Sequence, residues 1–331
     1  MKLKRRIFNY SKNQTGMTLV ELMVAMTLSL VILAGVIQVF ISSKQSYRLN
    51  DAMSRVQENG RFAINFLVKD IRMAGFYGCA SGTTPTNHVN SAGSYDYGGP
   101  PIEGTDGASG TADTLIIRAA TPSDILLTAS MPLVSADLKT TSPSGLAEGD
   151  IIMVSDCASS DVMQITGPSG TGPSDTGNVV HNTGVGTPGN ATKNLSKAYG
   201  TDAVVMKMNE FTYSIQTGAS GQPALFRNNN NGTAMELVEG VDNMQILYGV
   251  DTDADSNKVA NIYSDATTVD AANNWNNVVS VRISLLLQTI DDNVASSEID
   301  YFYNGVNNSP TTGRKLRRVF TTTINVRNRT L

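Results

Sequence analysis

The segment from Met17 to Ile41 contains a single charged residue, Glu21, among residues that are mostly apolar. A helix over these residues, at roughly 1.5 Å per residue, is about 37 Å long and can cross a bilayer with some tilt. Placing a charged carboxylate within a membrane-spanning helix costs free energy, which indicates that Glu21 has a function. A basic stretch precedes the segment and predicts a cytoplasmic N-terminus, with export of the rest of the chain. Its cations are Lys2, Lys4, Arg5, Arg6 and Lys12.

The junction at Gly16 distinguishes this segment from an ordinary secretory signal. Such a signal has a shorter apolar core followed by a small-residue cleavage site, and residues 36–46 offer no clean site of that kind. Cleavage between Gly16 and Met17 would instead remove the basic leader and leave the apolar helix on the mature protein. The alternative is a plain signal anchor that carries a stray glutamate.

The run from Gly16 to Glu21 reads Gly-Met-Thr-Leu-Val-Glu. It resembles the class III signal of type IV pilins and of type II secretion pseudopilins. The resemblance implies that a prepilin peptidase cleaves after Gly16 and N-methylates Met17, and that Glu21 is the family's assembly glutamate. A buried carboxylate needs a partner, and the new amine of a neighbouring subunit would supply one in a helix bundle. Many major pilins have a proline midway along this helix, whereas here only Gly35 could weaken it.

The helical pattern continues beyond the apolar segment. Apolar residues recur at three- and four-residue steps between residues 49 and 74, charged residues lie between them, and no proline occurs before Pro85. One continuous helix of about 80 Å is therefore expected from about Thr18 to about Met73. Gly60 is the weak point of its second half.

From residue 79 onward, Gly, Ser, Thr, Asn and Asp become frequent, and short runs alternate between apolar and polar residues. The predicted fold is α+β and pilin-like: a long N-terminal helix packed on a C-terminal antiparallel β-sheet domain. Its predicted parts are the leader (1–16), the membrane-spanning or filament-core half of the helix (17–41), the amphipathic half (42–78) and a periplasmic β-rich domain with long loops (79–331).

The predicted strands are Thr114–Ala119, Asp150–Ser155, Val162–Thr166, Ala203–Met208, Phe211–Gln216, Met244–Val250, Val278–Thr289 and Val319–Arg327. The seventh strand is predicted to cross the core against the long helix, because alternate apolar residues share one face. These residues are Val279, Val281, Ile283, Leu285 and Leu287. Residues 82–111 and 167–196 are predicted to form long, polar, mobile loops.

Cys79 and Cys157 are the two cysteines of the chain. In an exported domain two cysteines most simply form one disulfide, which here would fasten the end of the helix to the sheet. Free thiols or a redox role are the alternative.

Two groups of segments resemble PilW-type minor pilins. One group covers residues 57–64 and 70–79, at the end of the helix. The other covers residues 236–251, Trp275, and residues 279–287 and 318–328, and the loop-rich middle is largely unmatched. The resemblance implies a minor pilin that resides in the bacterial inner membrane, primes type IV pilus assembly and supports twitching motility and adhesion. Its implied partners are other minor pilins, the major pilin, the prepilin peptidase, the inner-membrane assembly platform and a large tip adhesin.

The sequence offers no constellation for catalysis and implies no cofactor. His88 and His181 lie in Gly- and Asn-rich stretches, which argues against a zinc cluster or a His-dependent triad. The Gly-Ala-Ser-Gly and Gly-Pro-Ser-Gly runs at residues 107–110, 167–170 and 218–221 read as turns, because they lack the spacing of a nucleophile elbow.

One spacing is typical of a metal site. Asp251, Asp253 and Asp255 alternate along the chain as in a calcium loop. However, Ser256 stands where that loop has glycine and Ile262 stands where it has a bidentate glutamate. These departures favour a solvated acidic turn over calcium.

The charge of the chain argues against nucleic-acid binding. The net charge is −4, and removal of the five leader cations takes it to about −9. Two further functions stay open: a J-type pseudopilin of type II secretion, and a membrane-anchored module whose loops bind a surface. A tether needs no free amine beside a buried carboxylate, so cleavage at Gly16 discriminates the binding module from an assembly subunit.

Overall fold

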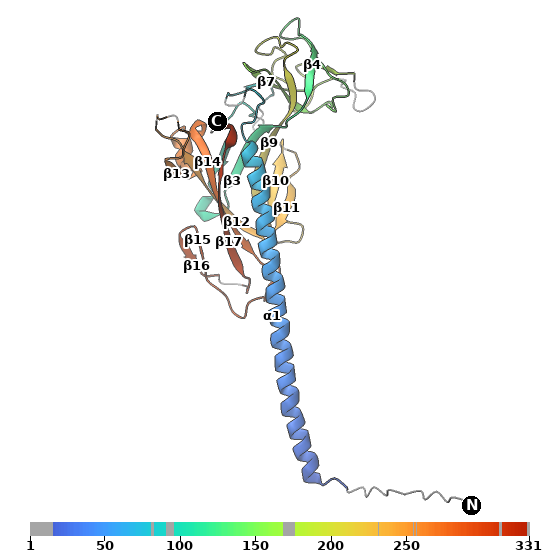
Figure 1. Cartoon of the computed structure of the whole chain (residues 1–331), viewed down its shortest axis with the longest axis vertical. Helices are drawn as coiled ribbons and strands as arrows, with labels where there is room; N and C mark the ends of the chain where they lie inside the picture. The colour runs from blue at the N-terminus through green and yellow to red at the C-terminus, as the bar shows by residue number, and fades with distance from the viewer. Residues whose placement is uncertain are drawn as a thin grey trace, which may run out of the picture. The chain divides into compact units, whose positions relative to one another are not determined.

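The computed structural model describes residues 16–80, 83–90, 96–167, 176–230, 232–253, 255, 257–310 and 313–329. Residues 1–15 of the predicted leader (1–16) lie outside the described residues. The chain forms two compact units, residues 1–51 and residues 52–331. Helix α1 (Leu19–Met73) runs through both, and the second unit holds all of the strands that the structure describes (Figure 1).

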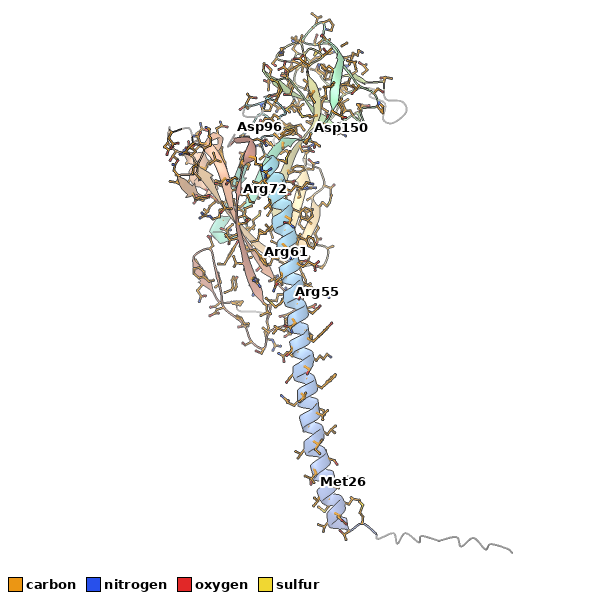
Figure 2. The ribbon with its side chains drawn as sticks, viewed as in Figure 1. Met26, Arg55, Arg61, Arg72, Asp96 and Asp150 are labelled. Carbon is orange, nitrogen blue, oxygen red and sulfur yellow. A yellow bond between two sulfur atoms is a disulfide. The ribbon has the colours of Figure 1, made fainter. Side chains whose placement is uncertain are left out.

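Helix α1 confirms the predicted continuous helix, since it begins one residue after Thr18 and ends at Met73. It is long and apolar enough to cross a membrane, by length and composition. Every residue from Gly16 to Asp51 is exposed, and the side chains of this part project outward around the helix, as at Met26 in Figure 2. The helix ends because Gly75 adopts φ +71°, a left-handed conformation that favours glycine, and its N–H donates to the carbonyl of Arg118.

The second half of α1 buries one face. Its buried residues are Val56, Gly60, Ala63, Leu67, Asp70 and Ile71. The apolar members of this face share one hydrophobic core with residues of two sheets, whereas Glu58 and Arg61 on the opposite face are exposed. This half of the helix therefore contributes a strip of the main core of the second unit.

The sheet β13-β12-β14-β17 is antiparallel throughout and contributes most of the core that contacts α1. Its strands are β12 (Val241–Val250), β13 (Ile262–Ser264), β14 (Val278–Gln288) and β17 (Arg317–Asn325). The short helix α2 (Ala266–Ala271) follows β13, and a separate hairpin pairs β15 (Tyr301–Tyr303) with β16 (Val306–Asn308). The predicted fold class is confirmed.

A larger sheet of eleven strands is centred on the long strand β9. One half of β9 pairs with β4 and β6, and the other half pairs with β3 and β10. The pairing is antiparallel except between β1 and β7. The strands are β1 (Thr86–Asn87), β2 (Ile102–Thr105), β3 (Thr114–Ala120), β4 (Ile125–Ala129), β5 (Leu138–Thr140), β6 (Ile151–Ser155), β7 (Ser160–Gln164), β8 (Asn178–Val179), β9 (Val204–Thr217), β10 (Pro223–Asn229) and β11 (Met235–Glu239).

The prediction of two strands, Ala203–Met208 and Phe211–Gln216, is wrong, because β9 continues through Asn209 and Glu210. Asn209 and Glu210, which the two predicted strands left out, are accommodated within the sheet. The Glu210 carboxylate accepts a hydrogen bond from Arg118 Nε at 2.8 Å, and both side chains are buried. A buried charge that has its counter-charge does not interrupt a strand.

The face assigned to the strand at residues 278–289 is wrong at one position. Val281, Ile283, Leu285 and Leu287 lie in the core with α1, as predicted. However, a register irregularity places Val250 of β12 opposite Val278, so Val278 joins this core in place of Val279. An extra residue in one strand reverses which side chains face the core.

α1 continues without a break through Gly60, and the space beside this residue is occupied by a side chain of β17. A methyl group added at Gly60 would lie 2.5 Å from Cζ of Phe320. Glycine at this position therefore allows the helix to approach the ring closely, at the expense of about 1 kcal/mol of helix propensity relative to alanine.

Gly60→Ala is expected to lower the free energy of unfolding of the full-length chain by about 1–3 kcal/mol, because the ring of Phe320 must move. In a Phe320→Ala background the same change is expected to stabilise the chain by up to about 1 kcal/mol, because only the helix propensity remains. Urea unfolding of the four proteins in detergent measures this coupling. Equal effects of Gly60→Ala in both backgrounds would contradict the account.

Candidate functional site

The predicted cleavage junction precedes the helix directly. Gly16 and Met17 are exposed and lie outside α1, which begins at Leu19. A methyl group added at Gly16 would meet no atom within 4 Å. The junction is therefore an accessible, non-helical segment, which suits a bond that a peptidase must reach.

Thr18 and Glu21 cap the start of α1. The Glu21 backbone N–H donates to the Thr18 hydroxyl, and the Glu21 carboxylate accepts from the Thr18 backbone N–H, each at 3.3 Å. This reciprocal pair is a capping box, which satisfies donors that the first turn of a helix leaves free. The Thr-Leu-Val-Glu run thus specifies a helix start. This cap was not predicted, although the spacing of Thr18 and Glu21 that identifies it is present in the sequence.

The Glu21 carboxylate lies in the apolar segment from Met17 to Ile41, all of whose residues are exposed. Most of these side chains are large and hydrophobic, such as Leu19, Val31 and Phe40, each more than 65% exposed. Exposed apolar surface around a whole helix requires lipid or other helices to cover it. Glu21 would be enclosed along with that surface.

The predicted disulfide joins Cys79 and Cys157, with the two Cα atoms 4.8 Å apart. Cys79 follows the end of α1, and Cys157 follows β6. Beside the disulfide, the Ser155 hydroxyl donates to the carbonyl of Tyr77 at 3.1 Å. The bond therefore links the end of the helix to the larger sheet, as the sequence predicted.

A second link between α1 and the sheets is polar and was not predicted. The Tyr213 hydroxyl donates to the buried Asp70 carboxylate at 2.5 Å, and Arg227 Nη1 donates to the same carboxylate at 3.1 Å. Burial, and then the Asp70 charge, raises the pKa of Tyr213, so its hydroxyl stays protonated and can donate. Because Tyr213 is on β9 and Arg227 is on β10, the three residues fix the rotation of α1 against these strands.

The two histidines are buried in structural contacts. His88 Nε2 lies 2.5 Å from Asp161 Oδ1, while Ser196 Oγ and the Tyr199 hydroxyl each donate to Oδ2 of the same carboxylate at 2.6 Å. Burial alone would raise the pKa of Asp161, but hydrogen bonds from these three side chains lower it below its usual value. His181 Nε2 lies 3.1 Å from the carbonyl of Lys193.

This cluster is not a catalytic triad. In a triad the serine bonds to the histidine, whereas here both side chains bond to Asp161, and the described residues contain no hydrogen bond between His88 and Ser196. The runs at residues 107–110 and 218–221 lie in turns closed by backbone hydrogen bonds, from Thr111 to Ala108 and from Gly221 to Gly218. Residues 168–170 of the remaining run lie outside the described residues.

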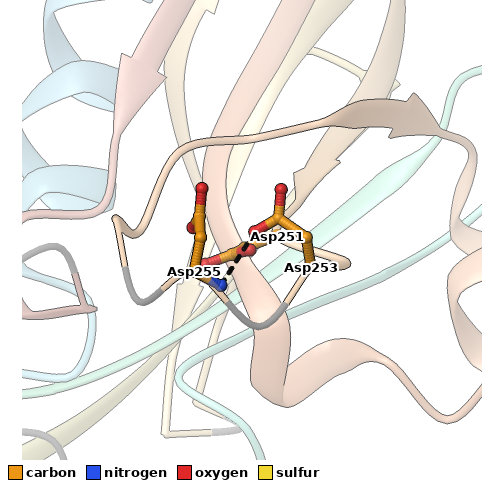
Figure 3. Close-up of side chains that lie close together, drawn as sticks. All are labelled: Asp251, Asp253 and Asp255. Atoms are coloured by element: carbon orange, nitrogen blue, oxygen red, sulfur yellow. Dashed lines mark hydrogen bonds between the residues drawn. The ribbon is translucent and has the colours of Figure 1, made fainter.

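Asp251, Asp253 and Asp255 come together in the loop between β12 and β13 (Figure 3). One carboxylate oxygen from each lies within 4.8 Å of the others. Hydrogen bonding with Asp255 lowers the pKa of the Asp253 carboxyl, so this group stays ionised at neutral pH. Ser256, which occupies the glycine position of a calcium loop, lies outside the described residues.

Two family models match the chain. The model of the Type IV Pilus-assembly protein W matches residues 212–328, and the model of the Prokaryotic N-terminal methylation motif matches residues 11–37. The chain is a PilW-family protein of the type IV pilin superfamily. The first match spans β12, β14 and β17, which pack on α1, and the second spans the capping box and the Gly16 junction. No curated protein and no solved structure matches the chain.

Membership of the PilW family makes this chain a structural protein of type IV pilus assembly and not an enzyme. Its N-terminal hydrophobic helix is of the prepilin type and is consistent with a location in the inner membrane or the pilus. The pilus machinery is accordingly its class of partner.

Loss of the disulfide is expected to lower the free energy of unfolding of this PilW-family chain by about 2–5 kcal/mol. Urea unfolding of the Cys79→Ser/Cys157→Ser variant and of the parent chain measures the effect. Both cysteines are exposed, so dithiothreitol should reduce the disulfide of the parent chain and lower its urea unfolding midpoint to that of the variant. The midpoint of the variant itself should not change. A variant as stable as the oxidised parent would contradict this role.

Proposed function

We propose that this PilW-family chain is a minor pilin that a prepilin peptidase cleaves between Gly16 and Met17. The observation that carries the proposal is the match to the methylation motif over a helix start that is exposed and preceded by a non-helical junction. Cleavage removes the basic leader and leaves a new amine, N-methylated, on Met17. The apolar helix from residue 17 to residue 41 then enters the inner membrane and, later, the filament core.

Glu21 has two possible partners at these two stages. In the single chain its carboxylate completes the capping box with Thr18. In a bundle of pilin helices the carboxylate lies in an apolar environment, where the amine of a neighbouring subunit's Met17 would neutralise it. The 3.3 Å cap bonds are long, so they offer little resistance to exchange for a charge-assisted pair.

The partners of this subunit are other minor pilins, the major pilin and the inner-membrane assembly platform, with a large adhesin at the tip. The residues after α1 form the periplasmic part, and the exported location agrees with the disulfide. In this role the subunit primes filament assembly and supports twitching motility and adhesion. The match to the pilus-assembly protein favours this role over a J-type pseudopilin or a plain tether.

Substitutions at Glu21 and Thr18 separate charge from helix capping. Glu21→Gln keeps an acceptor at the capping position but removes the charge, and Glu21→Ala removes both. We expect both variants to be folded, cleaved and membrane-bound, and to lower surface piliation at least ten-fold. Thr18→Ala removes the cap but keeps the charge, and we expect near-normal piliation.

Piliation is measured by shearing filaments from cells that carry each variant and quantifying the pilin released. Glu58→Gln, an exposed charge change in the second half of α1, is the matched control. Normal piliation in Glu21→Gln would refute the assembly role of the charge. A defect in Thr18→Ala as large as that in Glu21→Gln would assign the function to the cap instead.

A further inference from the structure

The loop after β12 brings three carboxylates together at the end of the sheet that packs on α1. Asp251 directly follows Val250, which lies in the main core, and its backbone N–H donates to the carbonyl of Asn277 at 2.9 Å. Asp251 is therefore fixed to the sheet, whereas Asp253 and Asp255 lie on the exposed loop. The side chain of Asp251 lies close to those of Asp253 and Asp255 (Figure 3), with one carboxylate oxygen of each within 4.8 Å of the others.

The Asp251 carboxylate is buried without compensation. Its residue is only 9% exposed, and its buried Oδ1 has no hydrogen-bond partner among the described residues. A buried polar atom that lacks a partner costs free energy, and a charged one costs more than a neutral one. This oxygen therefore requires a donor or a cation.

The surrounding side chains do not supply the missing positive charge. Within the described ranges, no ion pair joins a Lys, Arg or His to any of the three carboxylates. Carboxylates within 4.8 Å of one another repel when all are ionised.

Two asparagines orient the exposed carboxylates. Asn261 Nδ2 donates to Asp253 Oδ2 at 2.7 Å, and the Asn257 backbone N–H donates to Asp255 Oδ1 at 3.0 Å. Each exposed carboxylate keeps unused acceptor capacity, because an ionised carboxylate has about four lone-pair sites.

We propose that Asp251, Asp253 and Asp255 bind a calcium ion. The donor set consists of carboxylate oxygen atoms at alternate positions of one loop, as in the first half of a calcium-binding loop. Histidine and cysteine, which would favour zinc, take no part in the cluster. The ion would supply the positive partner of Asp251 Oδ1 and would tie the exposed loop to the end of β12.

The departures from an EF-hand loop set the affinity of the site. Ile262, which starts β13, cannot provide the bidentate carboxylate, so water must complete the coordination shell. With three carboxylates and an incomplete shell, we expect a Kd of roughly 10⁻⁴ to 10⁻³ M, the range of extracellular calcium modules. Such a site would fill only after export, because cytosolic calcium is far lower.

Isothermal titration of the full-length chain in detergent with CaCl₂ tests the proposal. We expect the parent chain to bind one calcium ion. The Asp253→Asn/Asp255→Asn variant should bind calcium with a Kd at least ten-fold higher. Both residues are exposed, so this variant is expected to fold. The matched control is Glu298→Gln/Asp300→Asn, which removes the same charge from another exposed segment and should bind calcium as the parent does.

Thermal unfolding provides a second readout. Calcium at about ten times Kd should raise the Tm of the parent and the control, but not that of the Asp253→Asn/Asp255→Asn variant. MgCl₂ at the same concentration should have little effect, because Mg²⁺ demands a more rigid octahedral shell. Absence of binding heat, or equal calcium affinity in the parent and the variant, would overturn the proposal.

Discussion

The buried face on the second half of α1 is the contact on which the rest of the chain depends. Leu67 and Ile71 are completely buried, and they share one core with β12, β14 and β17. The Asp70 carboxylate adds a directional contact, because Tyr213 and Arg227 both donate to it from neighbouring strands. Apolar packing supplies most of the free energy that holds α1 on the sheets. These hydrogen bonds select one rotation of the helix about its axis.

A single helix thereby serves two environments. Residues from Leu19 to Asp51 are exposed, whereas residues from Val56 onward are buried on one face of α1. The change from a helix that is apolar all round to one with a single apolar face occurs without a proline or a break in α1. It depends only on where polar residues begin to alternate with apolar ones. In this PilW-family chain, one helix therefore supplies both an apolar surface that lipid or other helices must cover and a strip of the core of the second unit.

Sequence reasoning predicted the features that local periodicity and motif spacing determine. The bounds of α1, the disulfide and six strands that match one to one follow from helical period, cysteine count and alternation. The strand β10 was missed because it begins at Pro223 and ends at Asn229, residue types that indicate turns. It forms a strand because β9 and β11 pair with it on both sides, a tertiary effect that no local pattern contains.

The polar contacts were the least predictable part of the candidate site. The two strands predicted in place of β9 left out Glu210, whose partner Arg118 is far away in sequence. Likewise, the burial of Asp251 depends on its position at the end of a core strand, which alternating aspartates alone do not reveal. The capping box of Thr18 and Glu21 is the exception, since the spacing of three residues between them is visible in the sequence.

The N-terminal mass of the protein from its native membrane, with and without the prepilin peptidase, tests most directly whether α1 is processed for a filament. The account predicts a chain that starts at N-methylated Met17 when the peptidase is present and at Met1 when it is absent. A chain that starts at Met1 in both strains would contradict the account and would leave a signal anchor whose glutamate only caps its helix.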